Sequence, residues 1–189
     1  MDEPQAWEVL GSDYLSRNRW LTVRQDRVRL PNGAVIDDFF VLEYPAWVNV
    51  VAVTPDDRLV LVRQYRHGLG RVGVELPAGA VDPGDASLEA AARRELLEET
   101  GYGGGTWSSL CVVSANAGTH NNLAHSFLAV GVEPVAPPSL EATEDIQVLT
   151  VSVAEAMRVV DEGQMVQAQH LAPLLKYLLR RAVEQPLPR

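Results

Sequence analysis

The chain has 189 residues, of which 47% are apolar and 22% are charged, a composition typical of a globular protein that can bury a sizeable core. Its formal net charge of −9 repels a phosphate backbone and argues against nucleic-acid binding. A single cysteine, Cys111, excludes a disulfide framework or a cysteine zinc site within one chain. The sequence has no apolar run near the ~20 residues of a membrane span and no signal-peptide pattern at its acidic start, so we expect a cytoplasmic protein.

The first half of the sequence predicts β-structure. Residues 19–30 and 34–44 alternate in part between apolar and polar side chains and flank the turn "PNG", which is typical of a hairpin. Residues 47–55 and 58–66 predict a second strand pair, with "DD" at the turn. Residues 72–85 predict a strand that continues into a loop rich in proline and glycine.

The second half mixes helices with strands. The first clear helix is "SLEAAARRELLEETGY", where Ser87 caps the start and Gly101 ends it. A later helix opens with Ser152 and Glu155 at the spacing of a capping box, and the last helix contains Pro173, which should kink it or start a new helix. Further strands are predicted at 107–115, 123–133 and 145–153. This order favours a mixed sheet with helices on both faces.

The helix segment "RRELLEETGY" concentrates negative charge on one side. At about 100° per residue, Glu95, Glu98 and Glu99 share one arc of ~100°. Like charges at i, i+4 destabilise an isolated helix, so this arrangement needs compensation. A solvated face paired with Arg94 is one explanation, and a hard divalent cation, which prefers oxygen ligands, is the other. The preceding loop "LPAGAVDPGD" favours the cation because it brings bare backbone close to the helix start.

These residues resemble the signature of the Nudix hydrolase family. That signature is Gly, five residues, Glu, seven residues, then Arg-Glu-apolar-x-Glu-Glu-x-Gly-apolar. This chain has Gly79, five residues, Asp85, eight residues, and then a complete match from Arg94 to Tyr102. It departs twice, since Asp85 stands in the place of Glu and one extra residue precedes Arg94, and both departures leave the role of Asp85 open.

The resemblance implies an α/β fold, a Nudix-type α/β/α sandwich with a mixed sheet, preceded by an N-terminal antiparallel β segment. It also implies a Mg²⁺ site, in which Mn²⁺ can substitute. Glu95 and Glu99 would be the main metal ligands, Glu98 a supporting ligand with a catalytic role, and the carbonyl of Ala78 a further ligand. Arg94 would belong to the catalytic set and Gly79 to the substrate site.

The flanks of the signature resemble the branch that hydrolyses ADP-ribose and nucleoside diphosphate sugars. In "RQYRHGLGRVGVELPAG", Arg66 would bind the diphosphate, as a bidentate guanidinium suits, and Glu75 would face the metal or substrate or else be held by local hydrogen bonds. In the acidic loop before the last strand, Glu144 would be the catalytic base, with Glu141 as the alternative. A third possibility is that the loop is merely solvated and has no catalytic role. The roles of His120 and His125 stay open between sugar contact and structure.

The same branch supplies an interpretation of the N-terminal part. Residues 1–46 would form a β segment that contributes to a homodimer, and residues 47–185 the catalytic domain. Trp20 stands where some relatives stack an aromatic ring on the nucleobase, although a tryptophan on a hairpin is otherwise a core or dimer contact.

The predicted function is therefore Mg²⁺-dependent hydrolysis of ADP-ribose or a related nucleoside diphosphate sugar to a nucleoside monophosphate and a sugar phosphate. Its partners would be a small nucleoside diphosphate sugar and a second copy of the chain, with no nucleic acid and no membrane. The alternatives are a catalytically silent module that binds a nucleotide sugar and regulates, or a hydrolase of dinucleoside polyphosphates.

Overall fold

The computed structural model describes residues 3–18 and 21–184. Their contacts divide the chain into two compact units. The first comprises the chain up to Pro45 together with the segment 114–122, which the sequence alone assigned to the second part of the chain. The second comprises the remainder of the described chain. Among the described residues, no helix combines the length and the hydropathy needed to cross a membrane.

The first unit is a three-stranded antiparallel sheet in the order β1-β2-β3, with bounds β1 (Glu8–Arg17), β2 (Thr22–Arg29) and β3 (Val35–Glu43). The β2–β3 hairpin follows the sequence prediction, but β1 was missed because it shows little alternation and carries two register irregularities against β2. The buried Asp26 accepts hydrogen bonds from Ser12 (2.6 Å) and from Arg24 Nε (2.8 Å). The strands are thus joined by polar contacts more than by an apolar core.

The second unit is built on a seven-stranded mixed sheet, in which β4 pairs in parallel with β9 and the other pairs are antiparallel. The strand order is β10-β5-β4-β9-β8, with β6 added to β5 and β7 added to β4. The bounds are β4 (Trp47–Val53), β5 (Arg58–Arg66), β6 (Arg71–Glu75), β7 (Ala78–Ala80), β8 (Tyr102–Val113), β9 (Ala124–Pro134) and β10 (Ile146–Ser152).

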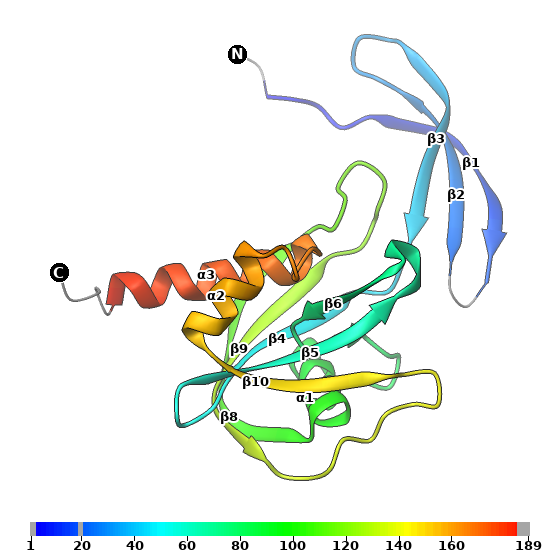
Figure 1. Ribbon diagram of the computed structural model, residues 1–189. Coiled ribbons are helices and arrows are strands. Elements are labelled where there is room, and N and C mark those ends of the chain that lie inside the picture. The colour runs from blue at the N-terminus through cyan, green and yellow to red at the C-terminus, as the bar shows by residue number, and fades with distance from the viewer. Residues whose placement is uncertain (1–2, 19–20, 185–189) are drawn as a thin grey trace. The chain divides into compact units, whose positions relative to one another are not determined.

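Helices cover both faces of this sheet (Figure 1), as the sequence predicts. In β4, Val48 and Val50 pack with helix α1 (Leu88–Thr100), whereas Val51 packs on the opposite face with α2 (Val153–Asp161) and α3 (Ala168–Glu184). Because successive residues of a strand point to opposite faces, a nearly continuous apolar strand is needed at the centre of such a sandwich. The fold is therefore the expected α/β/α sandwich.

The helix ends follow the predicted caps. Ser87 Oγ accepts from the Ala90 N–H, and Gly101 ends α1 in the left-handed region at φ 74°. A Cβ at Gly101 would lie 2.1 Å from the Ala136 carbonyl oxygen, so only glycine fits there. Ser152 and Glu155 form the predicted capping box of α2.

Helix α3 departs from its prediction. It begins at Ala168 and continues through Pro173, so the proline does not start a new helix. Proline has no backbone N–H, and the carbonyl four residues earlier, that of Gln169, consequently loses its helical donor. The Asn49 side chain replaces that donor, since its Nδ2 donates to the Gln169 carbonyl at 2.9 Å. A side chain of the central strand thus fixes the start of α3 to the sheet.

Candidate functional site

The predicted acidic helix packs against the short strand β7. Glu99 of α1 is buried, with 4% of its surface exposed, and its carboxylate accepts a hydrogen bond from the Ala78 N–H at 2.9 Å. Strand β7 is held in place by β4, in which Val48 pairs with Gly79 and Asn49 with Ala78. The structure therefore brings the loop residues and the helix carboxylates together, as the sequence predicts.

Gly79 leaves the space that the Glu95 side chain occupies. A Cβ on Gly79 would lie 2.1 Å from Glu95 Oε1 and 2.4 Å from Oε2, which no real side chain tolerates. The φ angle of Gly79 is not in the left-handed region, so the requirement for glycine here comes from this close approach alone. The contact explains why a glycine precedes the helix at this spacing.

Arg94 links the carboxylates of the site. Its Nη1 donates to Glu95 and to Glu98, both at 2.9 Å, and its Nη2 donates to the Ala80 carbonyl at 3.1 Å. Bonding to Asp85 is the main cause that raises the pKa of Arg94 above its ordinary value. The guanidinium is a permanent cation that partly balances the negative charge of the helix.

Asp85 is the residue whose role the sequence left open, and the structure shows what it contacts. Its carboxylate receives two hydrogen bonds from Arg94, from Nε at 3.1 Å and Nη2 at 3.0 Å, and one from the Asp82 N–H. Its side chain is one methylene shorter than glutamate, and the loop that carries it is one residue longer. The bidentate contact with Arg94 is made with both departures present.

Two carboxylates at this site, the buried Glu99 and the half-buried Glu95, lack a full complement of positive charge. Burial, opposed by Arg94, raises the pKa of Glu95 to about 7, and burial raises the pKa of Glu99 to about 8 despite the bond from Ala78. Within the described ranges no three acidic, histidine or cysteine side chains form a ready-made metal cluster, since Glu95 and Glu98 are turned to Arg94. The oxygen-only donor set and the uncompensated burial nevertheless fit a hard divalent cation.

Arg66 and Glu75 form a second charged pair. They end the adjacent strands β5 and β6, and Arg66 donates from Nε at 2.9 Å and from Nη2 at 2.5 Å to the Glu75 carboxylate. Burial opposes ionisation of Glu75, but the bonds from Arg66 and Gln167 outweigh it and lower its pKa. Glu75 is only 3% exposed and its carboxylate is held by local hydrogen bonds, the second of the two arrangements considered for it from the sequence.

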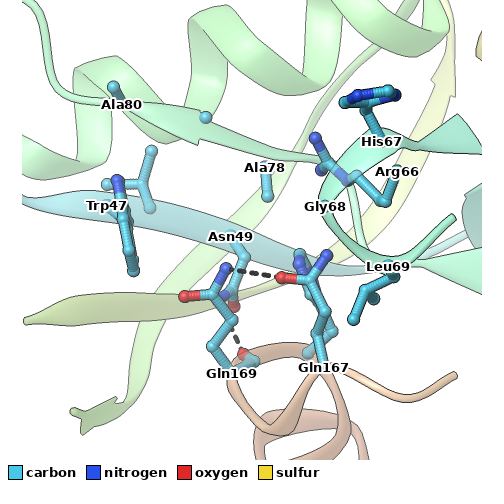
Figure 2. A pocket seen from close by; sticks show the side chains of 13 residues that line it. Trp47, Asn49, Arg66, His67, Gly68, Leu69, Ala78, Ala80, Gln167 and Gln169 are labelled. Atoms are coloured by element: carbon cyan, nitrogen blue, oxygen red, sulfur yellow. Dashed lines mark hydrogen bonds between the residues drawn. The ribbon is translucent and has the colours of Figure 1, made fainter. Parts of the chain in front are cut away.

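A cavity of about 520 Å³ lies beside this pair (Figure 2). Its walls are the turn after β5, the strands β4 and β7, and the residues around the start of α3. Arg66 reaches into it from one side, and Trp47, Ala78, Gln167 and Gln169 are among its lining residues. The cavity therefore adjoins both the arginine pair and the strand that contacts Glu99.

Sequence reasoning missed the polar floor of this cavity, which is formed by Asn49, Gln167, Gln169 and His170. His170 is 1% exposed, and its Nε2 lies 3.6 Å from Glu75 Oε2. Burial lowers the pKa of His170 to about 4, so the ring is neutral near pH 7. The sequence signal that could have pointed to this floor is Pro173. A proline inside a helix leaves the carbonyl four residues earlier, here that of Gln169, without its helical donor, so a side chain such as that of Asn49 must supply one.

The other residues singled out in the sequence are one glutamate, two histidines and one tryptophan. Glu144 accepts from the Glu141 N–H at 2.8 Å, and its charge adds to the effect of burial in raising the pKa of Glu95 and of Glu99. His120 lies in the first unit, with its ring 5.1 Å from that of Tyr44, and His125 lies in β9. Trp20 lies outside the described residues.

Comparison with known proteins covers nearly the whole chain. A family model described as the NUDIX domain matches residues 43–172, and one described as the nucleoside diphosphate sugar hydrolase N-terminal domain matches residues 7–42. The chain is 31% identical to an ADP-ribose pyrophosphatase of Mycobacterium tuberculosis, over 96% of this chain and 88% of the other. It is likewise 31% identical to an ADP-ribose pyrophosphatase of Bacillus subtilis, over 94% of this chain and 95% of the other.

A crystal structure of an ADP compounds hydrolase superposes with a TM-score of 0.83. The superposition covers 99% of this chain and all of the other, at 22% sequence identity. At that identity the likeness establishes the shared fold.

Proposed function

From the premise that the chain belongs to the Nudix hydrolase family, we propose that it cleaves the diphosphate of ADP-ribose or a related nucleoside diphosphate sugar. The products are a nucleoside monophosphate and a sugar phosphate, and the cofactor is Mg²⁺, with Mn²⁺ able to substitute. The observation that carries this proposal is the ion pair of Arg94 with Glu95, next to the buried Glu99 that bonds to β7, together with a cavity that β7 lines and Arg66 enters. The similarity to two ADP-ribose pyrophosphatases supports it.

The metal site comprises the carboxylates of Glu95, Glu98 and Glu99 and the carbonyl of Ala78. Bound there, Mg²⁺ supplies positive charge against the diphosphate and activates water for attack. Arg94 keeps the Glu95 and Glu98 side chains oriented, and Gly79 gives Glu95 room beside β7. Glu98, the most exposed of the three glutamates, has 44% of its side chain exposed and is thus accessible to substrate and water.

Glu144 is the proposed base that accepts the proton of the attacking water, with Glu141 as its alternative. The influence of its charge on Glu95 and Glu99 supports a place near the helix carboxylates. Its bond to the Glu141 N–H orders the loop through Oε2, and Oε1 can accept from a water molecule while that bond is kept. Arg66 is the proposed diphosphate ligand, because a guanidinium offers a second edge after Glu75 has engaged the first.

A substrate panel tests this function. We expect kcat/KM in Mg²⁺ to be highest for ADP-ribose or a close nucleoside diphosphate sugar, among ADP-ribose, ADP-glucose, GDP-mannose, UDP-glucose, ATP and diadenosine tetraphosphate. A diphosphate carries less charge than a triphosphate, so one arginine with the metal site suffices.

A tenfold preference for ATP or the dinucleoside would contradict the proposed substrate class. Binding of a nucleotide sugar without turnover of any compound would instead favour the catalytically silent regulatory module. The acidic net charge supports a small-molecule substrate rather than a nucleic acid, and we place the reaction in the cytoplasm.

Metal binding should couple to pH through Glu95 and Glu99. Both have an ordinary pKa of 4.5, and their pKa values in the folded state are about 7 and about 8. Between pH 4.5 and pH 8, the metal-free folded state therefore binds more protons than the unfolded state. Their stabilising contribution is complete below the ordinary pKa and is lost as the pH rises through the folded values. We expect the Tm in EDTA to fall from pH 6.5 to pH 9, and the Tm increase caused by MgCl₂ to be larger at pH 9.

Thermal unfolding in EDTA and in MgCl₂ at pH 6.5, 7.5 and 9 measures both effects. The double variant Glu95→Gln/Glu99→Gln is the control, because it removes both titrating groups and should flatten the dependence. An Mg²⁺-induced shift in Tm that is the same at all three pH values would count against these two residues as ligands.

The first unit supports the proposal of a homodimer. Within its described residues only Asp26, Val28 and Asn122 are buried, whereas six large apolar side chains are at least 40% exposed: Trp7, Val9, Tyr14, Leu15, Val35 and Phe40. A three-stranded sheet with so little core needs further apolar cover. We propose that residues 1–46 supply part of a C2 interface and that residues 47–185 form the catalytic domain.

Light scattering at micromolar concentration should therefore report twice the mass of the 20.7 kDa chain. Replacing exposed Phe40 and Leu15 by Ser should shift the protein toward the monomer, since both changes reduce the apolar area offered to a partner. A monomer in the unaltered protein would refute the dimer.

A further inference from the structure

We propose that Gln167 is a positioning residue that fixes the orientation of Arg66 by binding the Glu75 carboxylate from another element of the fold. The inference rests on the proposed function in one respect, namely that Arg66 is the group that binds the diphosphate. Among the described residues, Gln167 makes no hydrogen bond to the proposed metal ligands or to Arg66, so its effect on the reaction passes through Glu75.

The first step is the way Glu75 holds Arg66. Glu75 Oε1 accepts from Arg66 Nε and Oε2 accepts from Arg66 Nη2, which aligns one edge of the guanidinium with a buried carboxylate. Within the described part of the chain, Arg66 Nη1 makes no hydrogen bond, and 39% of the Arg66 side chain is exposed where the residue lines the cavity. Glu75 therefore determines the direction in which the remaining donor edge points.

The second step is the way Gln167 holds Glu75. Gln167 Nε2 donates to Glu75 Oε1 at 2.6 Å, the same oxygen that accepts from Arg66 Nε. A buried carboxylate that lost this bond would keep its partners on the arginine side but gain freedom to rotate. Because the bond reaches Glu75 from the start of α3 and not from β5 or β6, it restrains the pair from outside its own hairpin.

The third step is the way the amide of Gln167 is oriented. Gln169 Nε2 donates to Gln167 Oε1 at 3.2 Å (Figure 2). This bond turns the Gln167 amide so that its nitrogen donates to Glu75. Hydrogen bonds therefore run in one direction, from Gln169 to Gln167 to Glu75. A glutamate in place of Gln167 would reverse the last contact and set two carboxylates against each other.

The fourth step is the anchor of this chain of contacts. The Gln169 carbonyl, freed by Pro173, accepts from Asn49 Nδ2, and Asn49 pairs in register with Ala78. One short segment of α3 is thereby tied to the Arg66–Glu75 pair and also to the strand beside β7, where the proposed carbonyl ligand lies. The fold uses this segment to keep the diphosphate arginine in register with the metal site.

The test compares Gln167→Leu with Gln164→Leu. The control makes the same substitution three residues earlier, where, among the residues that the structure describes, the side chain bonds only to Glu162. We expect Gln167→Leu to raise KM for ADP-ribose about tenfold and to change kcat by less than about threefold, because a misdirected arginine weakens binding more than it alters the chemical step. Gln164→Leu should match the unaltered protein in both constants.

A double-mutant cycle and a spectroscopic measurement show whether the effect passes through Arg66. In an Arg66→Lys background, Gln167→Leu should add less than twofold to KM, since lysine cannot use the bidentate contact. The ¹⁵N heteronuclear NOE of the Arg66 Nε–Hε group, assigned by its loss in Arg66→Lys, should fall in Gln167→Leu and stay unchanged in Gln164→Leu.

An unchanged Arg66 signal in Gln167→Leu, or a full additive effect in the Arg66→Lys background, would overturn the proposal. The spectroscopic measurement needs no substrate and no metal. If the unaltered protein hydrolysed none of the panel compounds, the proposed function would fail, while the Arg66 signal would still decide whether Gln167 positions that side chain.

Discussion

Glu99→Gln should lower kcat by at least about 100-fold, an effect comparable to removing a strong electrostatic group at the transition state. The fold should persist, because burial already raises the pKa of Glu99 to about 8 and the metal-free protein near pH 7 therefore holds a largely protonated carboxyl, which glutamine mimics. The amide oxygen can still accept from the Ala78 N–H. The Tm in EDTA should change little, and the Tm increase caused by MgCl₂ should be lost. The same change at Glu98 should cost as much in kcat.

Glu89→Gln is the matched control for both substitutions. Glu89 lies on the same helix, but its carboxylate bonds to Arg93 on an exposed face. Activity and the Mg²⁺-induced Tm increase should therefore remain normal in this variant. Activity close to that of the unaltered protein in both Glu98→Gln and Glu99→Gln would remove the basis for the metal site.

Gly79→Ala should also lower activity by about 100-fold, and for a steric reason. The added methyl group would overlap the Glu95 carboxylate, with 2.2 Å between the new Cβ and Glu95 Cδ. The group that must yield is the end of a flexible side chain, so the loss of stability should be small while Glu95 is displaced from its place beside β7. We expect a Tm within a few degrees of the unaltered protein and a sharply higher Mg²⁺ concentration for half-maximal activity.

Gly84→Ala is the control for this substitution, because a Cβ at Gly84 meets nothing within 4 Å and lies in the same loop region. It should behave as the unaltered protein does. A second check is non-additivity, since Gly79→Ala should cost little further activity once Glu95→Gln has been introduced. Normal Mg²⁺ dependence in Gly79→Ala would show that the position of Glu95 is not critical.

Local sequence patterns predicted much of the second unit. The caps at Ser87 and Gly101, the capping box at Ser152 and the β4–β5 pair are all present, because each depends on residues close together in the chain. Strand β1 escaped detection because it lacks regular alternation. Of the two roles predicted for Pro173, a kink or a new helix start, the second is wrong. The donor that compensates for its missing N–H, Asn49, lies over 100 residues earlier, where no local pattern connects it to the proline.

The candidate site also combines features that a local sequence pattern predicts with contacts between residues far apart in the chain. The signature from Arg94 to Gly101 placed the helix carboxylates together because their spacing lies within one helix. The Gln167–Glu75 contact spans 92 residues of sequence and depends on how α3 meets β6, so no local pattern contained it. Likewise, the contact between Glu95 and Gly79 becomes visible only when β7 and α1 are placed side by side.

The bond between Asp85 and Arg94 bears on how the signature tolerates variation. Both departures from the signature, aspartate in the place of glutamate and one extra residue, fall on the segment that carries this carboxylate to the guanidinium. The bidentate contact is present with both of them. The contact is therefore made with a longer loop and a shorter side chain than the signature specifies. A comparison that counts residues along the chain registers "DAS" as a mismatch, whereas the distance between carboxylate and guanidinium in the folded chain is that of a normal ion pair.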